Sequence, residues 1–313
     1  MKAIIIDRYG SADVLQYREV EQPQIKPTEL LVKVRAASVN PLDWKTRQGM
    51  LKVLMNNKFP KILGADLSGE VVEIGNQVTR FQPGDEIYAS LTSSSGTYAE
   101  FVPVAENLAA PKPTNITHSE AGVVPLTAMT ALQALRNLGN IKAGDKVLIN
   151  GASGGVGIFA VQIAKAFDAE VTGVCSQKNS ELVKSLGCDR VIDYGQEDFT
   201  QDTTQYDIVF DAVAKSSFWQ CKNILKPEGM YISTLPSLSN LGAILATAIL
   251  SKQKAKLIIF QPNSQDLLYL KELIETGKLH PVIDRTYSLS ELAEAHKYSE
   301  SQRTAGKISI VIE

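Results

Sequence analysis

The chain has 313 residues, enough for two domains that each bury a core, and its 34 acidic and 32 basic side chains nearly balance. This balance gives no reason to expect a nucleic-acid partner. The three cysteines form no C-x-x-C pair and no even-numbered framework, and the longest apolar stretch, 241–250, is far shorter than the ~20 residues that span a bilayer. Because the N-terminal sequence also lacks a signal-peptide or transit-peptide pattern, we expect a cytoplasmic protein without a membrane span.

The first 120 residues have the pattern of short strands broken by turns. Apolar β runs at 3–6, 29–36 and 69–74 alternate with Gly and Pro turns at 22–24, 83–85 and 95–97. Many short strands with such punctuation predict a compact, mostly antiparallel β domain. Within it, Pro41 behind Asn40 predicts a helical turn over 41–48, with Asn40 as its cap.

A helical pattern follows at 119–138. Leu126, Met129, Leu132 and Leu135 recur on one stripe. We expect this segment to connect the β domain to the next one.

An apolar strand, a glycine turn and a helix start then occupy residues 146–167. Gly154, Gly155 and Gly157 let the backbone approach a ligand closely and leave the first N–H groups of the helix pointing outward, where a pyrophosphate is best stabilised. The strict G-x-G-x-x-G pattern is not met, because Ala152 stands at the first glycine position. Taken alone, the stretch is also compatible with a turn that binds nothing.

Further strands at 171–175, 190–194, 207–211 and 229–233 alternate with helical segments after this turn. This alternation is typical of βαβ units that wind a parallel sheet, so the second half is predicted to be α/β.

The end of the second sheet strand indicates which dinucleotide binds. The strand ends in Cys175-Ser176-Gln177-Lys178, and no carboxylate follows until Glu181. An NAD site usually has an acidic residue here, whereas Ser176 can donate to a 2′-phosphate and Lys178 can supply positive charge. The sequence therefore favours NADPH over NADH, with an ordinary solvated Lys178 as the alternative.

Motifs along the whole chain together resemble the medium-chain dehydrogenase/reductase superfamily. They lie at 36–45, 64–71, 83–85, 98–101 and 150–157, and the similarity continues at 175–176, 186–187, 191–194 and 306–310. Within the superfamily the sequence is most similar to the zinc-free NADPH:quinone oxidoreductase branch, including the reticulon-4-interacting-protein group.

The resemblance implies an α/β fold with a GroES-like β domain and a Rossmann domain whose parallel sheet is doubly wound. The expected bounds are 1–122 for the GroES-like domain, completed by 278–313, and 123–277 for the NADPH-binding domain. The active site is expected in the cleft between the two domains, lined by loops such as 48–60, 91–96 and 238–254. The last of these is apolar enough to form an interface, so a homodimer is plausible.

Zinc-dependent members of the superfamily hold their metal through motifs resembling C-x-x-D-x-H and G-H-E. The matching positions here are Asn40, Asp43, Lys45, Ala65 and Asp66, which lack the cysteine and histidine donors. Because catalytic zinc needs three protein donors and an open position, we expect no metal site.

Without a metal, the protein must stabilise charge with its own donors. Hydride transfer to a quinone or to the β-carbon of an enone places negative charge on an oxygen. Asn40, Lys45 and Tyr98 are the candidate catalytic residues in the β domain. The alternatives are a helix cap for Asn40, a solvated helix residue for Lys45 and strand packing for Tyr98. No nucleophile and base stand together, so covalent catalysis is not indicated.

The family resemblance also implies the cofactor contacts. Ser153, Gly154, Gly155 and Val156 are expected at the pyrophosphate, and Ser176, Lys178 and Tyr194 near the adenosine. The residues expected toward the nicotinamide are Thr127, Thr130, Leu235 and Phe260, with plain core packing as the alternative for Phe260.

These observations predict an NADPH-dependent, zinc-independent reductase of quinones or other α,β-unsaturated carbonyl compounds. A zinc-type alcohol dehydrogenase is disfavoured by the missing ligands. An NADPH-binding regulatory or scaffold protein without significant turnover stays open, because its cofactor residues would be the same.

Overall fold

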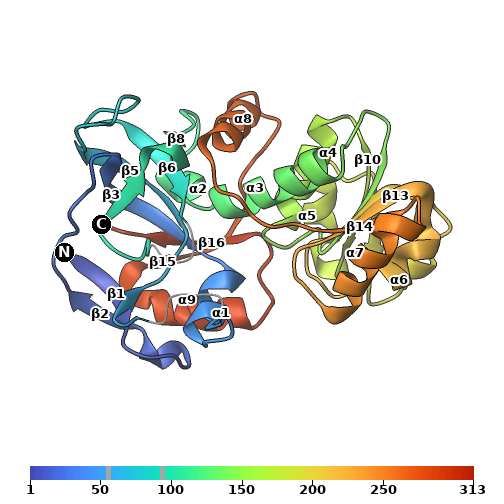
Figure 1. The fold of residues 1–313 in the computed structure, drawn as a ribbon, viewed down its shortest axis with the longest axis horizontal. Helices are drawn as coiled ribbons and strands as arrows, with labels where there is room; N and C mark the ends of the chain where they lie inside the picture. The colour runs from blue at the N-terminus through green and yellow to red at the C-terminus, as the bar shows by residue number, and fades with distance from the viewer. Residues whose placement is uncertain (54–57, 92–95) are drawn as a thin grey trace. The chain divides into compact units, whose positions relative to one another are not determined.

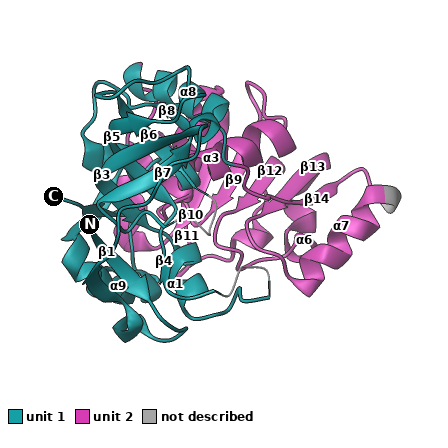
Figure 2. Ribbon diagram, turned by 60° about the vertical axis from the view of Figure 1, so that its left-hand side comes forward, with its two compact units in different colours: residues 1–126, 262–275, 281–313 teal, residues 127–261, 276–280 magenta. Residues whose placement is uncertain are grey.

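The computed structural model describes residues 1–53, 58–91 and 96–313, and the chain divides into two compact units (Figure 2). Unit 1 comprises residues 1–126, 262–275 and 281–313, and unit 2 comprises residues 127–261 and 276–280. Two of the loops expected around the active site, 48–60 and 91–96, lie partly outside the described residues.

Unit 1 is built on a mostly antiparallel sheet with the strand order β15-β16-β3-β5-β6-β8, on which β7 also pairs with β3 (Figure 1). Its strands are β3 (Glu29–Val39), β5 (Asp66–Ile74), β6 (Glu86–Ser90), β7 (Phe101–Ala105), β8 (Ala109–Pro111), β15 (Ile283–Ser288) and β16 (Lys307–Val311). A second sheet has the order β2-β1-β4 and consists of β1 (Lys2–Ile6), β2 (Gln16–Glu19) and β4 (Lys61–Ile62).

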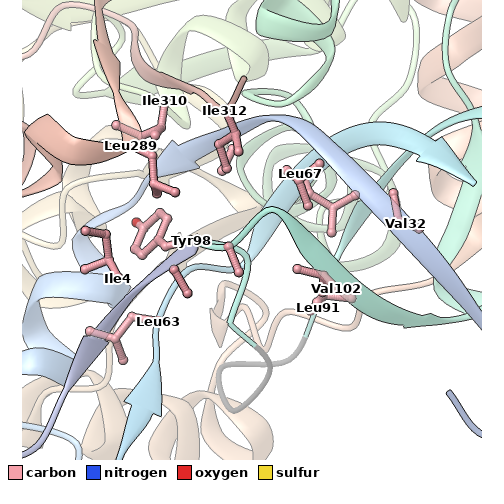
Figure 3. Packing of buried hydrophobic residues seen from close by; sticks show 14 of the residues in the cluster. Ile4, Val32, Leu63, Leu67, Leu91, Tyr98, Val102, Leu289, Ile310 and Ile312 are labelled. Carbon is pink, nitrogen blue, oxygen red and sulfur yellow. The ribbon is translucent and has the colours of Figure 1, made fainter. Parts of the chain in front are cut away.

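Strand β3 organises this unit. It pairs with β16, β5 and β7, and its burial follows from the apolar run that the sequence shows. The strand continues to Val39, three residues beyond the predicted run 29–36, and delivers Asn40 to the start of a helix. The core beside it includes Tyr98, whose ring lies among Ile4, Leu63 and Leu289 (Figure 3).

Short helices complete unit 1. They are α1 (Pro41–Arg47), α2 (His118–Ala121), α8 (Ser264–Glu275) and α9 (Leu292–Glu300), with the 3₁₀ turns η1 (Ala12–Val14), η2 (Glu106–Leu108) and η7 (Leu289–Glu291). The predicted domain bounds placed residues 262–275 in the Rossmann domain, whereas the structure groups α8 with unit 1. Tyr88 donates to the Leu267 carbonyl at 2.5 Å, and Asn115 donates to the Ile274 carbonyl at 3.0 Å, which ties the helix to β6 and to the loop after β8.

Unit 2 contains a six-stranded parallel sheet in the order β11-β10-β9-β12-β13-β14, whose strands are labelled in Figure 2. Its strands are β9 (Lys146–Asn150), β10 (Glu170–Cys175), β11 (Arg190–Asp193), β12 (Tyr206–Asp211), β13 (Leu225–Ser233) and β14 (Lys254–Leu257). The order runs outward in both directions from β9 and β12, which makes the sheet doubly wound and places the switch point at the carboxyl end of β9. The predicted α/β architecture, with a mostly antiparallel β unit and a doubly wound parallel sheet, is thereby confirmed. Strand β14 is the one described strand of this six-stranded sheet that the sequence pattern did not predict.

Helices connect these strands. They are α3 (Pro125–Leu132), which begins at the end of unit 1, the π-helix η3 (Gln133–Leu138), α4 (Gly157–Ala166), η4 (Gln177–Asn179), α5 (Ser180–Ser185), η5 (Phe199–Gln201), α6 (Phe218–Cys221), η6 (Lys222–Ile224) and α7 (Leu238–Leu250). Among the described helices, none combines the length and the apolar character needed to cross a bilayer.

Candidate functional site

The turn between β9 and α4 brings backbone close to backbone. Gly151 has a φ of +82°, a conformation that L side chains rarely adopt. A Cβ at Gly157 would lie 2.1 Å from the Gly151 carbonyl oxygen, so only glycine fits there. Ala152 occupies the first motif position without strain, because its φ is not positive and its side chain is fully buried. The relaxed glycine pattern therefore still forms the tight turn.

This turn presents free amides at the start of α4. Gly154 N–H donates to the Gly151 carbonyl at 3.0 Å. By contrast, the amides of Ser153, Gly155 and Val156 donate to no group in the part of the chain that the structure describes. Unpaired backbone N–H groups in the turn that begins a ten-residue helix favour an anion such as a pyrophosphate. The residues present therefore fit a dinucleotide.

The segment after β10 lies beside the glycine turn. Asn179 Nδ2 donates to Ser153 Oγ at 3.0 Å and joins the two loops. Within the described residues, the Ser176 hydroxyl and the exposed Lys178 ammonium have no hydrogen-bond or ion-pair partner. Both side chains are thus available to a phosphate group. Sequence reasoning missed Asn179, although its position directly after Lys178 could have suggested it.

Asp193 was also missed. It ends β11, in register with Cys175 at the end of β10, and its Oδ1 accepts from Gln177 N–H at 3.2 Å. From the sequence, a carboxylate that binds the ribose was expected only at the end of β10 or in the residues after it. Pairing of β10 with β11 instead brings the Asp193 carboxylate from the neighbouring strand to this segment.

Three of the other residues predicted to contact the cofactor follow the carboxyl ends of sheet strands. Tyr194 follows β11 and is 64% exposed, Leu235 lies beyond β13 and is 43% exposed, and Phe260 lies beyond β14 and is half-buried. Because the strands are parallel, these ends share one edge of the sheet with the glycine turn. Thr127 and Thr130 lie on α3, where both are buried.

In unit 1, a buried polar network forms where β3, β5 and α1 meet. Asp66 Oδ2 accepts from Ser38 Oγ at 2.7 Å and from Asn40 Nδ2 at 2.9 Å. Asn40 Nδ2 also donates to Ser38 Oγ at 3.2 Å, so both amide hydrogens of Asn40 are engaged. The other Asp66 oxygen accepts from Leu126 N–H at 2.8 Å.

Lys307 adds a cation to this network. Its side chain is 3% exposed, and its ammonium donates to Asn40 Oδ1 at 2.5 Å and lies 3.9 Å from Asp66 Oδ2. Burial lowers the pKa of Lys307, while the charges of Asp66 and Asp43 act in the opposite direction. The lysine begins β16, which pairs with β3 at Val39. It lies 267 residues from Asn40 in sequence, so sequence spacing gave no signal for the pair.

Asp43 and Tyr98 form a second part of the network. The Tyr98 hydroxyl donates to Asp43 Oδ2 at 2.9 Å, and Asn40 N–H donates to the same oxygen at 2.7 Å. Burial raises the pKa of Asp43 to about 7 against the opposing effect of these hydrogen bonds. Burial and the neighbouring Asp43 carboxylate raise the pKa of Tyr98 well above its usual range. Tyr98 therefore stays protonated as a hydrogen-bond donor.

Lys45, the third predicted catalytic residue, lies apart from this network. Its ammonium lies 5.5 Å from the centre of the Trp44 ring, and partial burial lowers its pKa. Nothing in the described chain accepts a hydrogen bond from it. Its three N–H donors are thus available to a ligand.

Comparison with known proteins identifies the family. The alcohol dehydrogenase GroES-like domain matches residues 26–114, and the zinc-binding dehydrogenase domain matches residues 186–310. The mitochondrial NAD(P)H oxidoreductase RTN4IP1 of Bos taurus is 37% identical, over 99% of this chain and 89% of the relative. The chain belongs to the medium-chain dehydrogenase/reductase superfamily. It is accordingly an oxidoreductase.

Other members of the superfamily match over nearly their full length. A chloroplastic quinone-oxidoreductase homolog of Spinacia oleracea is 35% identical, with 99% of this chain and 98% of the relative covered. The structure of the quinone oxidoreductase from Coxiella burnetii superposes with a TM-score of 0.92 at 33% identity, covering 100% of this chain and 99% of that one.

The zinc positions of the superfamily do not fit a metal in this chain. Across the described residues, no group of three His, Cys, Asp or Glu side chains has the arrangement to hold one. Asn40 donates a hydrogen bond to Asp66, and the Lys307 ammonium lies within ion-pair distance of the Asp66 carboxylate. His118 instead contacts Ser68 and Glu86, and His296 is fully buried near Arg47.

Proposed function

We propose that this protein is an NADPH-dependent, zinc-independent reductase that transfers a hydride to quinones or other α,β-unsaturated carbonyl compounds. The observation that carries the proposal is the glycine turn of unit 2, where the amides of Ser153, Gly155 and Val156 have no hydrogen-bond partner among the described residues. Relatives named as NAD(P)H and quinone oxidoreductases support the same reading.

Residues of unit 2 would hold the dinucleotide. The free amides and Gly154 suit the pyrophosphate, and Ser176 and Lys178 suit a 2′-phosphate. We assign Tyr194 to the adenosine end and Thr127, Thr130, Leu235 and Phe260 to the nicotinamide end. When bound, this cofactor supplies the hydride, and the protein supplies position and electrostatics.

We assign the charge-stabilising role in unit 1 first to Lys45. Reduction of a quinone or enone leaves negative charge on the acceptor oxygen, and a cationic donor lowers the free energy of that charge. Lys45 keeps its N–H donors available within the described structure, whereas Asn40 and Tyr98 donate to Asp66 and Asp43. Asn40 and Tyr98 would then contribute to catalysis by holding the start of α1, which carries Lys45, in place.

The donor set supports the proposed zinc independence. Zinc favours thiolate and imidazole ligands, and the corresponding positions carry an amide, a lysine and an alanine. We also propose a cytoplasmic location and a homodimer as the form in solution; the relatives named here include mitochondrial and chloroplastic proteins.

The experiment that tests this function is steady-state NADPH oxidation with a panel of quinones and enones. We expect turnover with at least one acceptor and a loss of about tenfold or more in kcat/KM for Lys45→Ala at saturating NADPH. Lys297→Ala, at an exposed lysine of α9, is the matched control and should retain wild-type kinetics.

A different result would point to another function. NADPH binding without turnover on the whole panel would favour a regulatory or scaffold protein. Unchanged kinetics in Lys45→Ala would remove Lys45 from the catalytic assignment.

A further inference from the structure

A carboxylate reaches the segment assigned to the adenosine end, although β10 itself ends without one. Asp193 lies at the end of β11, and strands β10 and β11 pair in parallel with Cys175 opposite Asp193. Asp193 Oδ1 accepts from the backbone N–H of Gln177 at 3.2 Å and of Gly195 at 3.0 Å. The carboxylate is therefore held against the loop that carries Ser176 and Lys178.

The second oxygen of this carboxylate is available. Within the described chain, Oδ2 of the half-buried Asp193 accepts no hydrogen bond, and no cation lies within ion-pair distance of it. Lys178, one residue beyond the Gln177 amide, likewise pairs with no carboxylate in the described structure. The neighbouring ends of β10 and β11 thus present an unneutralised anion, Asp193, and an unneutralised cation, Lys178.

These two charges favour different cofactors. A carboxylate accepts a hydrogen bond from the ribose 2′-hydroxyl of NADH and repels the 2′-phosphate of NADPH. A lysine ammonium attracts that phosphate and gains little from a hydroxyl. The two residues therefore pull cofactor preference in opposite directions.

We propose that Asp193 is a specificity-determining residue of the cofactor site, which allows NADH to compete with NADPH by accepting a hydrogen bond from the adenosine 2′-hydroxyl. This inference rests on the proposed nicotinamide-dependent function. It assigns the selection between the two cofactors to the balance of Asp193 against Lys178.

Asp193→Asn isolates the charge. An asparagine Oδ1 still accepts from the Gln177 and Gly195 amides, so the loop keeps its backbone contacts. The experiment measures the Kd of NADPH and of NADH by fluorescence titration of each variant. We expect the preference for NADPH, given as Kd for NADH divided by Kd for NADPH, to rise about tenfold or more in Asp193→Asn and to fall in Lys178→Ala.

Two controls separate charge from structure. Glu170→Gln removes a negative charge at the opposite, amino end of β10 and should leave the ratio unchanged. If Asp193→Asn is too unstable to measure, Asp193→Ser replaces it. This variant keeps a small hydrogen-bond acceptor and should also raise the ratio. A purely structural role would weaken both cofactors together and leave their ratio where it was.

The outcomes distinguish this inference from the function on which it rests. A wild-type protein that binds neither cofactor overturns both. A protein that binds them, but whose ratio in Asp193→Asn and Asp193→Ser stays within twofold of wild type or falls, overturns the role of Asp193 and leaves the proposed function standing.

Discussion

At the scale of single residues, Lys307 is the buried charge on which the polar network of unit 1 depends. We predict that Lys307→Met lowers the free energy of unfolding by about 3–5 kcal/mol, because it leaves the Asp66 carboxylate and the side-chain oxygen Oδ1 of Asn40 buried without their cation. Urea denaturation measures the effect. Lys297→Met, at a half-exposed position, should leave the midpoint unchanged. A Lys307→Met protein as stable as wild type would show that the contact contributes little.

Asp43 makes stability depend on pH. Its pKa is raised by burial from 3.8 to about 7, with Tyr98 and Lys307 opposing the shift and Asp66 adding to it. The folded state therefore binds more protons than the unfolded state between about pH 4 and pH 7, and stability falls as pH rises through that window.

We predict that Asp43→Asn removes this loss. An asparagine oxygen still accepts from Asn40 N–H and from the Tyr98 hydroxyl. The stability of the variant relative to wild type should therefore increase by up to about 4 kcal/mol between pH 4 and pH 7 and level off above it. Urea unfolding at a series of pH values measures the difference. A difference that does not vary with pH would mean that Asp43 is ionised throughout.

Sequence reasoning could find residues whose role is local. Ser153 and Gly155 follow a strand within a few residues, and Ser176 and Lys178 follow the next one, so chain order alone brought them to notice. Lys307 and Asp193 acquire their neighbours only through strand pairing, β16 with β3 and β11 with β10. From the sequence alone, a lysine in a β strand such as Lys307 suggests an exposed edge position. Only the pairing of its strand shows that it is buried.

At the scale of elements, the turn between β9 and α4 is the segment that the sequence predicted best. The apolar run, the glycines and the amphipathic helix follow one another directly in the chain. The end of β3 was harder to predict. The predicted apolar run ended at residue 36, whereas the strand continues to Val39 and the Ser38 hydroxyl within it donates to Asp66. Tertiary hydrogen bonding therefore set this boundary.

The glycine turn offers a test at this scale. We predict that Gly157→Ala weakens NADPH binding by about tenfold or more, because a Cβ 2.1 Å from the Gly151 carbonyl forces the backbone of the turn to move. Gly242→Ala is the matched control. It lies in the exposed part of α7, where a Cβ meets nothing within 4 Å, and should raise stability by about 0.5–1 kcal/mol without changing NADPH affinity. Equal affinities for Gly157→Ala and wild type would place the cofactor elsewhere.

At the scale of the whole molecule, alternating strands and helices predicted the doubly wound sheet, and short strands with turns predicted the β unit. The assignment of α8 could not be predicted in this way. Its amphipathic pattern fits a helix of either unit, and the Tyr88 and Asn115 hydrogen bonds that bind it to unit 1 come from residues about 160–180 positions away. Sequence patterns identify elements, whereas such distant contacts decide which core an element joins.

The central claim is hydride transfer from NADPH without a metal ion. The most direct measurement is NADPH consumption in the presence of an accepted quinone by protein that has been treated with a chelator and shown to be metal-free by elemental analysis. We expect the same rate before and after metal removal. Loss of the rate on chelation and its return with Zn²⁺, or no NADPH consumption by either preparation, would contradict it.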